Sequence, residues 1–167
     1  MEFRILGPLD VVDGPRAVAL PGAKHRALLA MLLLHANEVV STERLTEALW
    51  DDEPPETAQK ALQVYVSQLR KVLDDERLLT KAPGYLIHVE DDELDLSRFE
   101  RLVRDGMPRE ALELWRGPPL AEFTYADFAQ VAVRRTTLRA CQLYEPTQRI
   151  REPHVVDRPA VDLEQPR

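Results

Sequence analysis

The stretch TAQKALQVYVSQLRKVL, residues 57–73, carries the clearest pattern in the chain. Its apolar residues recur at the spacing of about 3.6 residues that gives a helix one buried face. With Leu62 at the centre of a helical wheel, the residues that fall within about 40° of it are Ala58, Val66, Leu69 and Leu73. This periodicity predicts one long helix whose apolar stripe packs on a neighbouring core.

The opposite face of this helix has a different chemistry. It consists of Thr57, Lys60, Val64, Ser67, Gln68 and Lys71, with Gln63 and Arg70 on its flank. Lysine and arginine donate hydrogen bonds to guanine edges or phosphates, glutamine pairs with adenine through two hydrogen bonds, and an exposed valine suits the methyl group of thymine. A helix that faces only water also carries charged residues, but water would not favour Val64 there. The face therefore indicates contact with the major groove of DNA, and a solvated helix surface is the alternative.

Two further helices are expected before this stretch. The first is an apolar helix over Lys24–Ala36, which follows a stop at Pro21-Gly22. After a short extended link at Val39-Val40 comes a short helix, capped by Ser41 or Thr42 and ending near Trp50. An exposed acidic loop is expected over Asp51–Glu56. The loop cannot continue the helix because Pro54 and Pro55 fix their own φ and restrict the residue before each. The long helix is therefore the third of a set.

Strands are expected at both ends of this region. After the long helix, Leu78–Thr80 and Tyr85–Val89 lie on either side of a Pro83-Gly84 turn and predict a hairpin. The segments with strand character near the N-terminus are Phe3–Leu6, Leu9–Val12 and Ala17–Leu20. The order sheet, helix, helix, loop, long helix, hairpin predicts a mainly α fold with small antiparallel β-sheets: a winged helix-turn-helix with an N-terminal β-sheet. In that arrangement the second helix of the pair enters the major groove.

The hairpin, or wing, adds two candidate contacts. Lys81 and Tyr85 flank its turn, where they can touch phosphates or the minor groove, and core packing is an equal alternative for Tyr85. Other groups that can donate hydrogen bonds to phosphate stand at helix starts, namely Gly22, Ala23, Lys24, Ser41 and Thr42. Helix capping is the simpler role for each of these.

The charge distribution matters more than its sum. The formal net charge is -7, which opposes a polyanionic partner over a Debye length. Residues 57–73 nevertheless hold Lys60, Arg70 and Lys71 and no acidic residue. A local positive face is thus expected on an acidic protein.

Composition and motifs argue against several other classes. The longest apolar run, Ala27–Leu34, is far too short to cross a bilayer, and the single Cys141 excludes an internal disulfide, so a cytoplasmic protein is expected. The four histidines, His25, His35, His88 and His154, lack metal-ligand spacing, and there is no nucleophile motif or glycine-rich phosphate loop. We therefore expect no catalytic residues, no metal and no cofactor; a small hydrolase is a third reading, without a candidate residue pair.

The second half of the chain predicts further helices. They are expected over Leu96–Val103, Glu110–Trp115 and Phe123–Leu143, with Gly106 and Pro108 between the first two. From Pro146 onward the chain has several prolines and no apolar period, which predicts a tail with little fixed structure. The expected division is a DNA-binding domain over 1–92, a partial helical domain over 93–145 and a tail over 146–167.

Several segments together resemble the Streptomyces antibiotic regulatory protein (SARP) family. In the first half they are FRILGPLDV, LPGAKHRALLAMLLLHANEVVSTERLTEALW, PPETAQKALQVYVSQLRKVL and APGYLIHV, and in the second half LDLSRFERLV and EALELWRGPPLAEFTYADFAQVAVRR. The family is similar to an OmpR-type winged helix fused to a helical, TPR-like bacterial transcriptional activation domain. Here the helical stretch between its second-half motifs is shortened to Val103–Ala111, and the resemblance ends after Arg135.

The resemblance also implies a role for each element and a more specific function. It puts the recognition helix on Thr57–Leu73, a transactivation-type loop on Trp50–Glu56 and the wing on Leu78–Val89. It implies an activator of biosynthetic, secondary-metabolism promoters that binds tandem direct repeats of double-stranded DNA as head-to-tail pairs and recruits RNA polymerase. The alternative is a protein-interaction scaffold that acts through its helical second half, with weak or no specific DNA binding.

Overall fold

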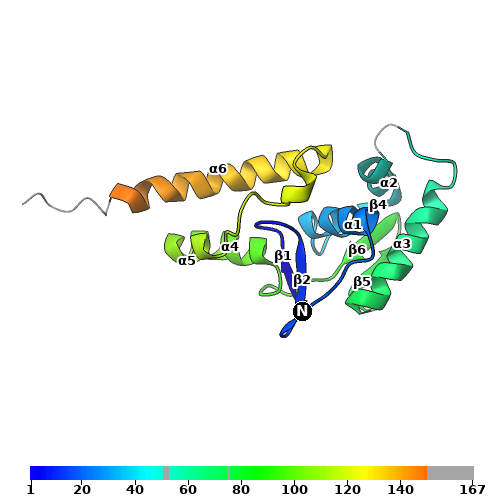
Figure 1. The fold of residues 1–167 in the computed structure, drawn as a ribbon, viewed down its shortest axis with the longest axis horizontal. Helices are drawn as coiled ribbons and strands as arrows, with labels where there is room; N and C mark the ends of the chain where they lie inside the picture. Colours follow the sequence, from blue (N-terminus) through cyan, green and yellow to red (C-terminus); the bar gives the residue numbers. More distant parts are fainter. Residues whose placement is uncertain (51–52, 75, 150–167) are drawn as a thin grey trace, which may run out of the picture.

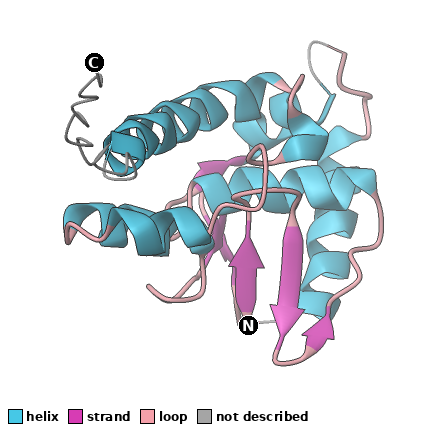
Figure 2. Cartoon of the chain, turned by 60° about the vertical axis from the view of Figure 1, so that its left-hand side comes forward, coloured by secondary structure: helices cyan, strands magenta, loops and turns pink. Residues whose placement is uncertain are grey.

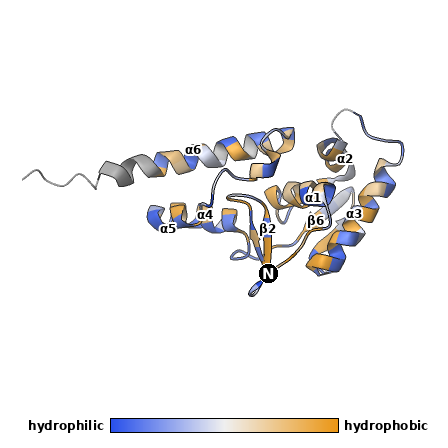
Figure 3. Cartoon of the chain, in the orientation of Figure 1, coloured by the Kyte–Doolittle hydropathy of each residue, from blue (hydrophilic) through white to orange (hydrophobic). Residues whose placement is uncertain are grey.

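A central apolar helix organises the first half of the molecule. The computed structural model describes residues 1–50, 53–74 and 76–149. Helix α1 (Ala23–Leu34) is buried along most of its length and packs against α2 (Thr42–Trp50) and α3 (Ala58–Leu73) (Figure 1). Figure 3 shows hydrophobic residues along α1, whereas hydrophobic and hydrophilic residues alternate along α3. The three predicted helices are therefore confirmed, each within about two residues of its expected start and end.

Two antiparallel sheets flank these helices. The N-terminal sheet contains β1 (Glu2–Arg4), β2 (Asp10–Asp13) and β3 (Arg16–Ala17) in that order. In the second sheet, β6 (Gly84–Ile87) lies between β4 (Val40–Ser41) and β5 (Leu78–Lys81). The expected extended link at Val39-Val40 is thus part of a paired strand, with Val40 opposite Tyr85. The wing is anchored on both sides of its inner strand.

Gly84 belongs to β6 rather than to the turn in which the sequence placed it. A Cβ atom built at Gly84 would lie 1.9 Å from the carbonyl oxygen of Val40. Such a contact is impossible, so only glycine lets β6 approach β4 this closely. The sequence suggested that Gly84 serves a turn, but the close packing of β6 against β4 is what requires a glycine there.

The second half is helical, with shifted boundaries. It contains α4 (Asp95–Arg104), α5 (Pro108–Glu113), the 3₁₀ turn η1 (Ala121–Phe123) and α6 (Asp127–Arg149). Pro108 begins α5 instead of separating it from α4, because a first-turn proline needs no hydrogen-bond donor. In Figures 1 and 2, α6 runs alongside α4 and α5.

The last helix differs from its prediction at both ends. It starts at Asp127 rather than Phe123, and it continues through Pro146 to Arg149, so the prediction of little fixed structure is wrong for residues 146–149. Pro146 thus lies inside a helix, although an interior proline lacks the N–H for one hydrogen bond and its ring crowds the carbonyl four residues earlier. Residues 150–167 of the expected tail lie outside the described residues.

The two halves share buried side chains. The larger hydrophobic core joins the helices of the first half to Leu94, Leu120 and Ala129. A smaller core contains Leu6 of the N-terminal sheet region with Phe99, Ala111 and Ala140. The boundary near residue 92 stays a prediction, but the apolar packing continues across it.

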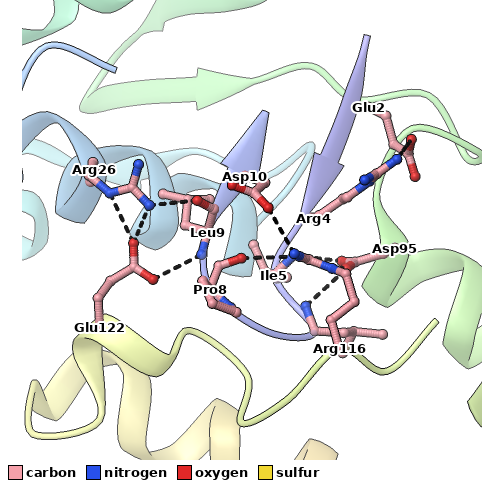
Figure 4. A network of polar contacts seen from close by, with 11 residues as sticks. Glu2, Arg4, Ile5, Pro8, Leu9, Asp10, Arg26, Asp95, Arg116 and Glu122 are labelled. Carbon is pink, nitrogen blue, oxygen red and sulfur yellow. Dashed lines mark hydrogen bonds and ion pairs between the residues drawn. The ribbon is translucent and has the colours of Figure 1, made fainter. Parts of the chain in front are cut away.

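Asp95, at the start of α4, ties the second half to the N-terminal sheet (Figure 4). Its carboxylate is 2% exposed and accepts hydrogen bonds from the backbone N–H groups of Ile5 at 2.8 Å and Leu6 at 2.9 Å. Burial raises the pKa of Asp95, while the two N–H groups and Arg116 act in the opposite direction. The carboxylate thus satisfies two buried donors at the end of β1.

Two arginines complete this junction. Arg116 donates to Asp10 at 2.9 Å and to the carbonyl oxygen of Pro8 at 3.0 Å. Glu122 accepts from the backbone N–H of Leu9 at 2.9 Å and pairs with Arg26 of α1 (Figure 4). The segment between β1 and β2 is therefore held from both halves of the molecule.

An ion pair, the Arg77–Glu93 clamp, joins the start of the wing to the segment before α4. Arg77, just before β5, forms two parallel hydrogen bonds with the carboxylate of Glu93, at 2.6 and 2.7 Å. The Arg77 guanidinium lowers the pKa of Glu93 to about 2. Such a two-point contact fixes direction as well as distance.

Candidate nucleic-acid interface

Helix α3 lies at the edge of the molecule with one face buried and one face open (Figure 1). The residues of its buried stripe are Ala58, Leu62, Val66, Leu69 and Leu73. These are the five residues that the periodicity assigned to the core. The opposite face is consequently free to meet a partner.

Six of the ten predicted DNA-binding residues share one shallow hollow on that open face. They are Lys60, Gln63, Val64, Ser67, Gln68 and Lys71. Val64 is 51% exposed at the centre of the helix, although a valine there gains nothing from water. Among the described residues, the two lysines form no ion pair, and α3 itself contains no acidic residue. The hollow combines positive charge, amide groups and one methyl-bearing side chain.

A second hollow continues from the first toward the wing. It is lined by Ser41, Thr42, Glu43, Gln59, Gln63, Pro83 and Tyr85. Gln63 lines both hollows, so the two form adjoining parts of one surface. Sequence reasoning did not single out Gln59, although its position one helical turn before Gln63 on the same flank was a usable signal.

The remaining predicted contact residues are placed less simply. Thr57 is exposed at the N-cap of α3, and its hydroxyl makes no capping hydrogen bond. Lys81 is exposed at the end of β5, beside the turn of the wing. Tyr85 is only 9% exposed and belongs to the larger core, so its ring contributes mainly to packing, with an edge on the second hollow.

Arg70 is engaged within the protein. Its Nε donates to the carbonyl oxygen of Leu78 at 2.8 Å, and its Nη2 donates to the hydroxyl of Thr80 at 2.8 Å. Both acceptors belong to β5, so the guanidinium links the end of α3 to the wing. The structure therefore separates Arg70, which holds the wing, from Lys60 and Lys71, which face outward.

The side chains at helix starts that could donate hydrogen bonds to phosphate are also engaged within the protein. The hydroxyl of Ser41 accepts a hydrogen bond from the backbone N–H of Arg44 at 3.2 Å, which is a capping contact. The hydroxyl of Thr42 donates to the carbonyl oxygen of Pro83 at 3.1 Å and so connects α2 to the wing. Lys24 donates to the carbonyl oxygen of Leu49 and lies over the ring of Trp50. These side chains already have partners in the fold.

An aromatic row supports α3 from beneath. Trp50 of α2 stacks on Tyr65 of α3 with ring centroids 6.0 Å apart, and Tyr65 meets the edge of His25 of α1 at 4.7 Å. His25 forms a hydrogen bond through Nε2 with Oε1 of Gln68 on the open face. The sequence gave no signal for this contact, because His25 and Gln68 are 43 residues apart.

The structure adds two negative findings. Within the described residues, no three histidine, cysteine, aspartate or glutamate side chains gather as metal ligands would. None of the described helices has the length and apolar character needed to cross a membrane.

Comparisons with known proteins point to one group. Residues 17–90 match the family described as "Transcriptional regulatory protein, C terminal". The chain is 32% identical to transcriptional regulatory protein MoaR1 of Mycobacterium tuberculosis over 82% of this chain and 51% of that protein. It is 35% identical to regulatory protein AfsR of Streptomyces coelicolor over 72% of this chain and 14% of that protein.

A solved structure agrees with the fold. Mycobacterium tuberculosis EmbR in complex with a low-affinity phosphopeptide matches with a TM-score of 0.75 and 29% identity, over 86% of this chain and 43% of that chain. The chain thus spans about half the length of MoaR1 and less of the other two proteins. The segment matched by the family, residues 17–90, includes α1, α2, α3 and the wing.

Proposed function

Since residues 17–90 form an OmpR-type winged helix and the chain belongs to the SARP-type regulators, we propose that it is a sequence-specific transcription regulator of double-stranded DNA. In this proposal the open face of α3 enters the major groove and the wing contacts the backbone. The regulators to which it is similar are not enzymes, and no catalytic step is proposed. A bacterial promoter-binding protein acts in the cytoplasm, which is where we place it.

The observation that carries the proposal is the outward face of α3. Lys60 and Lys71 stand at its two ends, and at a rise of about 1.5 Å per residue they are roughly 16 Å apart along the helix. The two ammonium groups can reach phosphates while Val64, Ser67 and the glutamines between them face base edges. Among the described residues neither lysine forms an ion pair, so the positive charge of this face is available to an external anion.

The finer parts of the proposal follow from the family. From the resemblance to SARP-type regulators, we propose an activator that binds tandem direct repeats as a head-to-tail pair and recruits RNA polymerase at promoters of a biosynthetic gene cluster. The acidic loop over residues 53–56 between α2 and α3 is exposed beside α3, at a position from which it can touch a neighbouring protein on DNA. The alternative of a pure protein-interaction scaffold makes the opposite prediction for DNA.

Selection of bound sequences from random double-stranded DNA, followed by a salt titration on the selected site, tests the proposal. Affinity should fall steeply as salt rises, because bound phosphates release counterions. Lys60→Ala and Lys71→Ala should each weaken binding several-fold, and each should reduce the slope of log affinity against log salt by about 1 if the lysine contacts phosphate.

A matched control removes an exposed charge elsewhere. Arg109 lies on α5, far along the chain from the open face, so Arg109→Ala should leave both affinity and slope unchanged. A lack of sequence enrichment together with a flat salt response would reject DNA binding and favour the scaffold.

A further inference from the structure

The side chain of Gln68 is held by a residue from another helix. His25 of α1 is 9% exposed and its Nε2 is hydrogen-bonded to Oε1 of Gln68. The imidazole is itself fixed by the edge contact with Tyr65, at 4.7 Å and 62°, and Tyr65 stacks on Trp50. Gln68 thus has its amide oriented from below by a packed aromatic row.

The atoms of this hydrogen bond determine which residue donates and which accepts. With Oε1 of Gln68 as the acceptor, this contact requires the His25 tautomer that carries its hydrogen on Nε2. The Gln68 Oε1 is therefore drawn toward α1, and the amide NH₂ group, which points away from it, is presented to the open hollow beside Ser67 and Lys71. On the outward surface Gln68 acts as a donor.

This orientation changes which base Gln68 suits. Pairing with adenine through two hydrogen bonds requires the glutamine oxygen to accept from adenine N6 while the NH₂ group donates to N7. Guanine instead offers two acceptors, O6 and N7, on its major-groove edge. Gln63, which has no side-chain hydrogen bond among the described residues, keeps the adenine option open.

We propose that His25 is a positioning residue that fixes Gln68 as a hydrogen-bond donor, so that Gln68 recognises guanine rather than adenine. The inference rests on the proposed function, since it concerns the base that the same face of α3 reads. It assigns a role in DNA specificity to a side chain of α1 that does not itself face the groove.

The test compares the base preferences of full-length variants. His25→Phe keeps the ring packing against Tyr65 but removes the donor, so the Gln68 amide can turn over. Sequences selected by the wild-type chain should contain a guanine that His25→Phe exchanges for adenine, with a change in relative preference of about tenfold at that one base pair. All other positions of the site should stay as they are.

Two further variants complete the design. Gln68→Glu has no donor for guanine, so it should lose the guanine preference at the same base pair; an unchanged preference would reject the contact between Gln68 and guanine even where His25→Phe fails to fold. Gln63→Glu is the control, and its effect should fall on a different base pair. Melting temperatures of the variants separate loss of fold from change of preference.

The outcomes distinguish this inference from the proposed function. If the wild-type chain selects no sequence, DNA recognition itself is rejected. If the wild-type chain selects a site but folded His25→Phe keeps its guanine preference, the role of His25 is rejected while the proposed function stands.

Discussion

Charged side chains are paired with opposite charges at the junction between the two halves, whereas, in the part of the chain that the structure describes, those on the open face of α3 are not. At the junction, Arg116 meets Asp10 and Asp95, and Arg26 meets Glu122 (Figure 4). On α3, Lys60 and Lys71 face outward from a helix without acidic residues.

This difference shows how an acidic protein can present a positive surface. Opposite charges in contact cancel each other locally and fix geometry, whereas lysines that form no ion pair keep their field for an external anion. The net charge of -7 therefore says little about the partner, because Arg4, Arg26 and Arg77 are paired with carboxylates inside the fold while, within the described residues, the two lysines of α3 are not. Placement rather than composition decides the function of a charge.

The largest expected effect comes from removing the buried charge of the junction. Asp95→Ala leaves the backbone N–H groups of Ile5 and Leu6 without acceptors in a buried site. We expect the free energy of unfolding to fall by about 3 kcal/mol. Denaturant unfolding measures this loss, and DNA affinity below the melting transition should be unchanged, since α3 is not involved.

Asp10→Ala is the matched control for this variant. Asp10 bonds the same Arg116 at 2.9 Å, but it is exposed, so its loss should cost less than about 1 kcal/mol. Equal losses from the two variants would mean that the buried N–H groups of the β1 end do not depend on Asp95.

A middle-sized effect concerns the pH dependence of the Arg77–Glu93 clamp. The pKa of Glu93 is lowered to about 2, so its stabilising contribution is present above the ordinary carboxyl pKa near 4.5 and is lost as pH falls toward 2. Glu93→Gln should therefore lower the free energy of unfolding by about 1 to 2 kcal/mol at pH 7. The difference from wild type should shrink between pH 4.5 and 2.

Unfolding curves recorded at several pH values follow this change. His88→Gln changes only the exposed His88–Glu90 contact, so it should alter the free energy of unfolding little at any of these pH values. A wild-type advantage that stays constant down to pH 2 would contradict the assigned pKa of Glu93.

The parts of this picture that the sequence could predict are local ones. The apolar stripe of α3, the order of the helices and the outward position of Lys60 and Lys71 follow from a 3.6-residue period read within one segment. The contacts Asp95 with Leu6 and His25 with Gln68 join residues 89 and 43 positions apart. No spacing rule links such pairs, because tertiary packing alone brings them together.

Gly84 and Arg70 show the same limit within the candidate interface. Gly84 looked like a turn residue, and only the pairing of β4 with β6 reveals the close approach that needs it. Arg70 looked like a third DNA contact, because charge and helical position are all that a wheel records. Its two acceptors on β5 lie in the next element of the chain.

The smallest expected effect on stability tests whether Arg70 belongs with the paired arginines or with the free lysines. Arg70→Ala removes two hydrogen bonds to β5, one of them to an exposed hydroxyl, so the free energy of unfolding should fall by about 1 kcal/mol. DNA binding should weaken a few-fold because the wing is held less firmly, but the slope of log affinity against log salt should stay as in wild type. A slope lowered by about 1, as expected for Lys71→Ala, would instead mean that Arg70 binds phosphate and that its contacts with Leu78 and Thr80 break on DNA.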